Sequence, residues 1–260
     1  MPKHRRIWNA DIHRKYIKEG RGSGSGSDYK PWIRIQDFAS RGVVSRVKGN
    51  TTGRVHHLMS KVELAYFYIL DWSESVTDIC EQYPLSDLEL AVKIAAKAGI
   101  KYPKDNVSGY PYILTCDFMV VTATGQKART IKMASELGNA RTLEKLEIER
   151  RYWLEYGVDW GIVTEREIPF EKAKNIEWIY SARGHGLIGG SLIKQEQAQE
   201  MMLCLLSMRH SIIEAAKMVE CHFRLDRGMG IQLFKHLALN ELVTVNLDSP
   251  LDLNARGATA

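Results

Sequence analysis

Three charged residues, Glu63, Asp117 and Lys132, are of the types that metal-assisted hydrolysis of a phosphodiester requires. Two carboxylates can hold a divalent cation, and a nearby lysine can orient water or offset the charge of a phosphate under attack. Hard oxygen ligands suit Mg²⁺ or Mn²⁺ better than Zn²⁺. These residue types therefore indicate a magnesium site of a nuclease, in which Mn²⁺ is expected to substitute.

A predicted hairpin brings the aspartate and the lysine together. Asp117 stands between two apolar runs, residues 112–116 and 118–121, and a turn signal follows at 122–125. The next short strand carries Lys132. Because side chains on neighbouring strands lie side by side, a carboxylate and an ammonium are expected to meet there.

Glu63 lies in a helix predicted from Ser60 to about Trp72, and its position allows two interpretations. The sequence Ser-Lys-Val-Glu at 60–63 is a capping-box pattern, in which the glutamate accepts from the N-cap amide. A strand aspartate and a strand lysine, likewise, commonly form an ordinary ion pair. Spacing taken alone favours these structural roles over catalysis.

Further stretches of the chain carry a family resemblance. They are residues 53–58 (GRVHHL), 141–153 (RTLEKLEIERRYW) and 175–180 (NIEWIY), with EGRG at 19–22, DY at 28–29 and PW at 31–32. Together they resemble TnsA, the endonuclease subunit of the heteromeric TnsA–TnsB transposases. The resemblance covers residues from about 15 to 180.

The resemblance implies an α/β fold like that of type II restriction endonucleases, with a mixed sheet flanked by helices. The family uses a helix glutamate, a strand aspartate and a Q-x-K-like pair, which correspond here to Glu63, Asp117 and Lys132. It implies that Glu63 and Asp117 hold the metal, that the backbone carbonyl of Ile131 completes the ligand set, and that Lys132 acts on water or phosphate. Thr130 stands at the glutamine position and is shorter, so its part in metal binding is doubtful.

The resemblance also implies a reaction and partners. We expect cleavage of the 5′ strands at transposon ends, leaving a 5′-phosphate and a 3′-hydroxyl, while a TnsB-type transposase subunit cuts and joins the 3′ ends. The expected partners are double-stranded DNA, that TnsB-type subunit and a TnsC-type ATP-dependent regulator. The alternative is a non-catalytic subunit that docks DNA and partners, and Thr130 is its main support. A stand-alone restriction or repair nuclease is disfavoured by the matches at 53–58 and 141–153.

Charge is distributed unevenly along the 260 residues. The chain carries a net charge of +5, whereas residues 1–61 contain 14 Lys or Arg against four Asp or Glu, a net of +10, and the remainder nets −5. A basic N-terminal quarter favours contact with a polyanion about as strongly as it favours a solvated arm. The candidate DNA contacts come from one basic stretch: Arg46, Lys48, Arg54, His56 and His57. Either histidine singly is more simply a polar loop residue.

The four cysteines, Cys80, Cys116, Cys204 and Cys221, show no C-x-x-C spacing. Cys80 and Cys116 sit in apolar runs and are expected to be buried thiols, as in a reducing compartment. The sequence shows neither a run long enough to cross a membrane nor a secretory signal. Together with the resemblance, these features lead us to expect a protein of the bacterial cytoplasm that acts on DNA.

The chain is expected to form a basic N-terminal arm (1–40), an endonuclease domain (41–165) and a C-terminal domain (166–260). The Gly-Ser run at 21–28 is most simply a flexible tether, although its amides could approach a phosphate. Periodicity and caps predict strands at 43–47, 76–83 and 160–164 and a helix beginning at Asn139 or Thr142.

The C-terminal domain is expected to be winged-helix-like. Helices predicted at 194–207, 211–221 and 229–240 precede a predicted strand at 243–247, with residues 227–240 in the place of a recognition helix. Such domains read DNA or dock proteins, and the fold alone does not decide between these roles. The scarcity of positive charge favours docking of the regulator or the transposase subunit.

Overall fold

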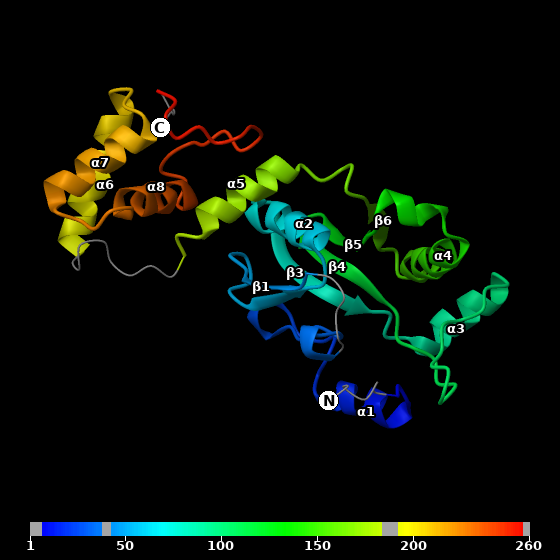
Figure 1. Cartoon of the computed structure of the whole chain (residues 1–260). Helices are drawn as coiled ribbons and strands as arrows, with labels where there is room; N and C mark the ends of the chain where they lie inside the picture. Colours follow the sequence, from blue (N-terminus) through cyan, green and yellow to red (C-terminus); the bar gives the residue numbers. More distant parts are fainter. Residues whose placement is uncertain (1–6, 38–42, 184–191, 257–260) are drawn as a thin grey trace, which may run out of the picture. The chain divides into compact units, whose positions relative to one another are not determined.

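The computed structural model describes residues 7–37, 43–183 and 192–256. The chain divides into two compact units, Met1–Ile168 and Pro169–Ala260. Figure 1 shows the first in blue to green and the second in yellow-green to red. The division lies three residues beyond the predicted boundary at 165. None of the helices in the described ranges is both long and apolar enough to cross a bilayer.

The first unit is built on a four-stranded sheet of β3 (Val76–Pro84), β4 (Thr115–Thr122), β5 (Gly125–Ile131) and β6 (Asp159–Val163), in that order. β4 is antiparallel to both β3 and β5, whereas β6 is parallel to β5. The predicted mixed sheet and the predicted hairpin are therefore confirmed.

A smaller sheet pairs β1 (Ser45–Lys48) with β2 (Val55–Leu58) in antiparallel register. The prediction of a strand near 43–47 is confirmed with later bounds. The prediction of loop residues at His56 and His57 is wrong, because both lie in β2. The two histidines point to opposite faces of that strand, as successive residues of a strand do.

Helices α2 (Lys61–Trp72) and α4 (Ala140–Glu155) lie beside the sheet, and α3 (Leu88–Lys97) lies beyond α4 (Figure 1). α2 contacts β2 and β3, while α4 contacts α3 and β6. Both predicted caps are present: Ser60 accepts from the backbone of Glu63, and Asn139 accepts from that of Thr142. α4 is the crossover that a parallel β5–β6 pair needs. A 3₁₀ turn, η3 (Ala134–Gly138), separates β5 from α4.

One core cluster of the first unit gathers buried side chains from the sheet, α3 and α4. Its fully or nearly fully buried members are Tyr29, Cys80, Leu85, Ala91, Ile94, Ala95, Cys116, Met119, Ala128, Ile148, Tyr152 and Trp153. Cys80 and Cys116 are thus buried free thiols, as predicted. Cys116 and Met119 of β4 belong to this cluster, so packing fixes the strand that carries Asp117.

The N-terminal residues pack against the first unit instead of forming a free arm. α1 (Ala10–Lys18) contributes Tyr16, which packs edge-on against Trp32 with ring centroids 5.5 Å apart. Trp8 stacks on Tyr112 and donates its indole N–H to the carbonyl of Pro111 at 2.8 Å. Within residues 7–37, the predicted separate arm is therefore wrong, because aromatic side chains anchor the segment to residues 110–113.

The Gly-Ser run at 21–28 is ordered, so the prediction of a flexible tether is wrong. Ser23 forms an antiparallel bridge with Lys30, and the amide of Gly26 donates to a carboxylate oxygen of Asp78 at 2.8 Å. Gly24 has φ +95°, and a Cβ there would lie 2.6 Å from the carbonyl oxygen of Asp28. The run is rich in glycine because this tight turn requires it. η1 (Gly26–Asp28) and η2 (Ile35–Asp37) complete the segment.

The second unit consists of α5 (Phe170–Tyr180), α6 (Leu192–Ser207), α7 (Ile212–Phe223) and α8 (Met229–Leu239). The three predicted helices are confirmed, and α5 precedes them. The glycine-rich break that the sequence places at 184–190 lies outside the described residues.

The predicted strand at 243–247 is not formed, and within residues 192–256 no named strand provides a wing. Val243 and Leu247 are buried, but the segment is held by a side chain instead of a neighbouring strand. Asn175 of α5 donates to the carbonyls of Leu247 and Ser249, both at 2.8 Å. The alternating apolar pattern therefore reflects burial on helices, which periodicity alone cannot distinguish from a strand.

Candidate active site

Asp117 lies in β4 with each carboxylate oxygen held by a neighbouring strand. Its Oδ2 accepts the backbone N–H of Ile131, at the end of β5, at 2.6 Å. Its Oδ1 accepts the side-chain amide of Gln82, in β3, at 3.2 Å. The side chain is 13% exposed. The carboxylate is thus oriented from both sides and still reaches the surface.

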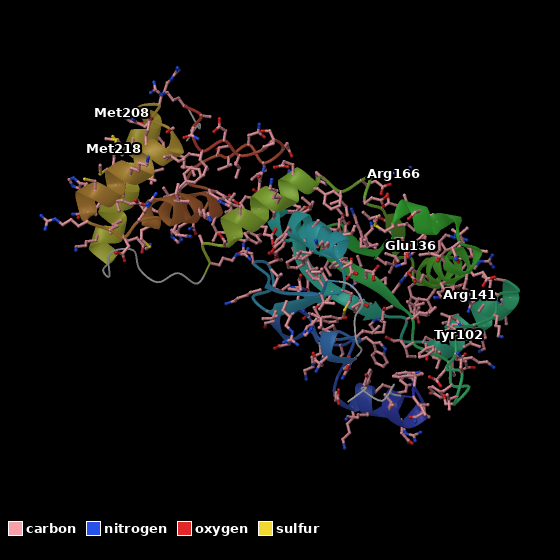
Figure 2. The ribbon with its side chains drawn as sticks, in the orientation of Figure 1. Tyr102, Glu136, Arg141, Arg166, Met208 and Met218 are labelled. Carbon is pink, nitrogen blue, oxygen red and sulfur yellow. The ribbon has the colours of Figure 1, made fainter. Side chains whose placement is uncertain are left out.

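Lys132 follows β5 directly and faces Asp117, as the hairpin predicted. Its ammonium lies 3.6 Å from Oδ2 of Asp117 and donates to the carbonyl of Ile131 at 2.8 Å. Burial opposes the charged ammonium, but the carboxylates of Asp117, Glu149, Glu136 and Glu63 outweigh it and raise the pKa of Lys132. Lys132 is therefore charged at neutral pH. Glu136 belongs to η3 and is labelled in Figure 2.

Glu63, in the first turn of α2, is buried at 7% exposure. Its carboxylate accepts the backbone N–H of Met59 at 2.9 Å and the hydroxyl of Ser60 at 3.0 Å. The capping interpretation is thus confirmed in part, with the amide of Met59 in the place expected for that of Ser60. Burial, followed by the charge of Asp117, raises the pKa of Glu63 to about 7. The cap and the electrostatic coupling to Asp117 therefore coexist.

Thr130 is buried, and its hydroxyl donates to Oε2 of Glu149 at 2.6 Å. Glu149 comes from α4, and burial raises its pKa to about 7, with a further contribution from the charge of Asp117. The hydroxyl hydrogen of Thr130 is therefore engaged with this carboxylate.

Sequence reasoning missed two side chains of this region, Glu149 and Gln82. Glu149 was detectable, because it lies between Leu146 and Trp153 on the apolar stripe of α4, where a carboxylate is unexpected. Gln82 carries no such signal. It is a polar residue in a strand whose neighbours are buried, and its contact to Asp117 depends on strand pairing.

The donor set fits a hard divalent cation. The carboxylates of Glu63 and Asp117 and the carbonyl of Ile131 are all oxygen donors, which Mg²⁺ and Mn²⁺ prefer. The ammonium of Lys132 supplies positive charge beside two of these groups, the carboxylate and the carbonyl. In the described residues no three His, Cys, Asp or Glu side chains gather into a metal site of their own. A cation here would therefore need the backbone carbonyl in addition to the two carboxylates.

Two of the five predicted DNA contacts are internal. Arg54 is 9% exposed, and its guanidinium donates to Glu81 and to the carbonyl of Ile79. His56 is fully buried, with its ring nitrogens 2.8 Å from Glu81 and 2.7 Å from Thr52. The prediction of DNA contact is wrong for both, because their polar atoms are used inside the fold.

The other three predicted contacts lie nearer the surface. Arg46 and Lys48 are exposed on the same face of β1, two residues apart. His57 is half-buried, its backbone N–H donates to Glu81, and burial lowers the pKa of its ring. Arg46 and Lys48 therefore carry most of the positive charge that the β1–β2 hairpin presents to solvent.

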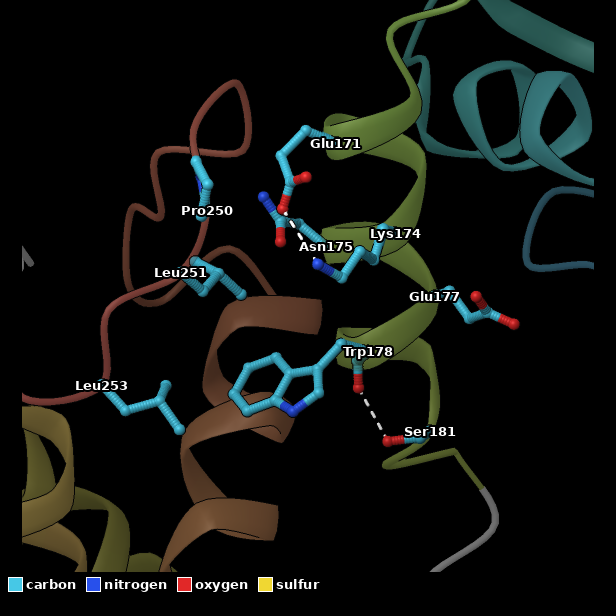
Figure 3. A pocket seen from close by; sticks show the side chains of 9 residues that line it. All are labelled: Glu171, Lys174, Asn175, Glu177, Trp178, Ser181, Pro250, Leu251 and Leu253. Carbon is cyan, nitrogen blue, oxygen red and sulfur yellow. Dashed lines mark hydrogen bonds and ion pairs between the residues drawn. The ribbon is translucent and has the colours of Figure 1, made fainter.

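The second unit contains a pocket between α5 and the segment at 250–253 (Figure 3). Trp178, Leu251 and Leu253 supply apolar lining, and Glu171 and Lys174 supply charge. The lining thus combines apolar side chains with a few polar ones, as pockets that bind ligands do.

Comparison with known proteins agrees with this geometry. The family model described as TnsA-like endonuclease N terminal matches residues 73–165, and the model described as TnsA endonuclease C terminal matches residues 167–247. The Escherichia coli protein named Transposon Tn7 transposition protein TnsA is 37% identical over 242 residues, which cover 89% of this chain and 84% of that protein. Asp117 and Lys132 both lie within the first matched region. The chain therefore belongs to the TnsA endonuclease family.

Proposed function

We propose that this endonuclease cuts the 5′ strands at the ends of a transposon in a Mg²⁺-dependent reaction, leaving a 5′-phosphate and a 3′-hydroxyl. The observation that carries the proposal is the juxtaposition of Asp117, Lys132 and the Ile131 carbonyl, coupled electrostatically to the buried Glu63. A structural ion pair has no need of a second, buried carboxylate whose pKa is raised to about 7.

Glu63, Asp117 and the Ile131 carbonyl would hold the metal. Mg²⁺, when bound, supplies Lewis-acid stabilisation of the phosphate charge and activation of water. The protein supplies orientation: the hydrogen bonds from Ile131 and Gln82 fix the Asp117 carboxylate, and those from Met59 and Ser60 fix Glu63. Ligands held in this way lose little freedom when a cation binds.

Lys132 would act on the substrate through charge. Its ammonium is 30% exposed, so one side is accessible while the other contacts Asp117 and Ile131. A cation fixed beside a scissile phosphate stabilises the negative charge that develops during attack. The ammonium does so without giving up a proton, because its raised pKa keeps it charged.

Thr130 is not needed as a ligand in this proposal. Its hydroxyl donates to Glu149, which leaves only its lone pairs for other partners. The departure from the family glutamine therefore adds little to the non-catalytic alternative, since Asp117, Lys132 and the Ile131 carbonyl lie together without it.

DNA would be held in part by the β1–β2 hairpin. Arg46 and Lys48 extend from one face of β1, and β2 leads within two residues to the N-cap of α2, whose first turn carries Glu63. Exposed Lys and Arg side chains bind phosphates independently of sequence. The hairpin would thereby hold the duplex beside the site.

The second unit would dock a TnsC-type regulator or a TnsB-type transposase subunit. Two features support this: the pocket along α5 and the exposed side chains of Met208 (65%) and Met218 (40%), labelled in Figure 2. Exposed methionines adapt to varied partners. In a pull-down, full-length protein should retain at least one partner that residues 1–168 lose. Equal retention by both forms would exclude docking by this unit.

The reaction itself is tested by mapping nicks on end-containing DNA. The protein is incubated with a TnsB-type partner, a TnsC-type regulator, ATP and Mg²⁺, and products are resolved on both strands. We expect nicks on the 5′ strands with 5′-phosphate termini, which vanish when EDTA replaces the metal. Nicks confined to the 3′ strands in a reaction with active partners would favour the assembly-only alternative.

A further inference from the structure

Gln82 has an unusual backbone conformation for its place in the fold. It lies inside β3 with φ +50°, in the left-handed region that side chains other than glycine rarely adopt. It is also buried, at 5% exposure. A glycine would adopt this backbone without strain, so a glutamine here points to a use for its side chain.

The side-chain amide of Gln82 is fixed at both ends by β4. Its Nε2 donates to Oδ1 of Asp117 at 3.2 Å, and its Oε1 accepts the hydroxyl of Thr115 at 3.2 Å. The flanking pairs of the two strands, Glu81 with Phe118 and Tyr83 with Cys116, place Gln82 opposite Asp117. An ionised carboxylate only accepts hydrogen bonds, so the amide presents its N–H to Asp117 and its carbonyl to the hydroxyl of Thr115.

Gln82 and Ile131 hold the Asp117 carboxylate from opposite strands. Ile131 in β5 donates to Oδ2, and Gln82 in β3 donates to Oδ1. Each carboxylate oxygen has two lone-pair directions, so one on each oxygen stays available to a cation. The two donors together fix the plane of the carboxylate.

A neutral side chain at position 82 also suits a carboxylate that is to bind a cation. A lysine or arginine at 82 would pair with Asp117 and compete with a cation, and a glutamate would add repulsion where Asp117 already raises the pKa of Glu63. A neutral amide donates a hydrogen bond without adding a second cation beside Asp117, whose Oδ2 already lies 3.6 Å from the ammonium of Lys132.

We propose that Gln82, held at its carbonyl by the hydroxyl of Thr115, is a positioning residue that sets the Asp117 carboxylate for binding a divalent cation. This inference rests on the proposed metal site. Hydrogen-bond partners of metal ligands typically change metal affinity 10- to 100-fold when removed. The left-handed backbone is then explained as the conformation that turns the amide toward Asp117.

The experiment measures Mn²⁺ binding to the full chain, by electron paramagnetic resonance of free Mn²⁺, beside thermal unfolding without metal. Gln82→Gly should weaken Mn²⁺ binding about 10-fold or more. The midpoint temperature of unfolding of this variant should lie within a few degrees of that of the wild type, because glycine relieves the strained φ. Thr115→Val keeps the strand and loses only the hydroxyl, and should weaken binding to a smaller extent.

Arg224→Gly is the matched control. Arg224 is an exposed residue with φ +52° at the end of α7, so the substitution also relieves a left-handed backbone, in the other unit. It should leave Mn²⁺ affinity unchanged. Should Gln82→Gly fail to fold, Thr115→Val decides the question.

Several outcomes would overturn the inference. Wild-type Mn²⁺ affinity in Gln82→Gly, or in Thr115→Val if the glycine variant does not fold, would show that Gln82 only joins the strands. Equal weakening in Arg224→Gly would show a general effect of backbone change. Wild-type protein that binds no Mn²⁺ would overturn the proposed metal site, and the role of Gln82 with it.

Discussion

Glu81 and Glu63 are both buried carboxylates of the first unit, yet their surroundings drive their pKa values in opposite directions. Burial alone would raise the pKa of Glu81, but hydrogen bonds and charge from Arg54 and His56 outweigh it and lower the pKa to about 2. Burial and the charge of Asp117 raise the pKa of Glu63 to about 7. A buried carboxylate with its cations in place stabilises the fold. A buried carboxylate whose pKa is raised by a second carboxylate would instead be stabilised in its charged form by a further cation.

The largest expected effect is on cleavage. Asp117→Ala should reduce 5′-strand cleavage by at least about 10³-fold, as loss of one member of a catalytic set commonly does. Removing this carboxylate takes away a ligand and also repulsion toward Glu63. The thermal midpoint should therefore change little. Gel assays of end cleavage and a melting curve test both statements, and cleavage at the wild-type rate would place the site elsewhere.

At Glu81 we expect the opposite of Asp117: a large loss of stability when its partner Arg54 is replaced. Arg54→Met removes the guanidinium that donates to both carboxylate oxygens and leaves a buried charge poorly paired. The free energy of unfolding should fall by about 3–5 kcal/mol. Denaturant titration measures it. Arg46→Met is the control, because that exposed side chain should cost about 0.5 kcal/mol or less. Equal losses in the two variants would contradict the contrast between the sites.

Opposite pH dependences follow from the two shifts. The folded-state pKa of Glu63, and likewise that of Glu149, lies above the ordinary value of 4.5, so its stabilising contribution is complete below 4.5 and is lost as pH rises towards about 7. For Glu81 the folded-state pKa lies below 4.5, so its contribution is complete above 4.5 and is lost as pH falls towards about 2.

Glu63→Gln tests this difference. Without metal, the variant should lose less stability than wild type between pH 5 and 7.5, by on the order of 1–3 kcal/mol, and behave like wild type below pH 4.5. Cleavage should collapse, because the amide carries no charge to hold a cation. Mg²⁺ should reduce the loss of wild-type stability at the higher pH. Strong destabilisation at every pH with cleavage retained would show that Glu63 is only a helix cap.

The smallest expected effect concerns DNA affinity. Replacing Arg46 and Lys48 together by Gln should reduce the slope of log K against log salt by about 2, one for each phosphate contact. Lys93→Gln with Lys97→Gln on α3 makes the same change of charge on another exposed surface. Fluorescence anisotropy over a salt series distinguishes the two. Equal slopes in both double variants would show that Arg46 and Lys48 act only through the net charge of the protein and not through phosphate contacts of their own.

These substitutions are a sharper test of the basic N-terminal quarter than a deletion. Arg21 is paired with Asp37, and Arg54 with Glu81, so part of the +10 charge of residues 1–61 is neutralised inside the fold. Deleting the first 30 residues would also remove Tyr16 from its packing on Trp32. A change in DNA binding would then be confounded with damage to the nuclease unit.

Local patterns in the sequence determined the elements that carry the site. The Ser60 cap, the apolar runs around Asp117 and the Asn139 cap are signals that operate within a few residues, and the structure forms all three elements. The same local rules predicted Lys132 within the second strand of the hairpin, and the structure places it directly after that strand, which ends at Ile131. Resemblance then singled out Glu63, Asp117 and Lys132, whose roles as ligands and catalyst stay predictions.

Only the tertiary structure decided which polar residues lie inside and what they touch. The sequence predicted Arg54 and His56 as DNA contacts at the surface. In the structure both are buried and pair with Glu81, which lies 25 or more positions away in the chain. The side chain of Gln82 reaches Asp117 only because β3 and β4 pair in one register and its φ is positive. Burial of a polar group is stable only when a partner satisfies it, and those partners come from distant parts of the chain. Periodicity within a single segment carries no information about them.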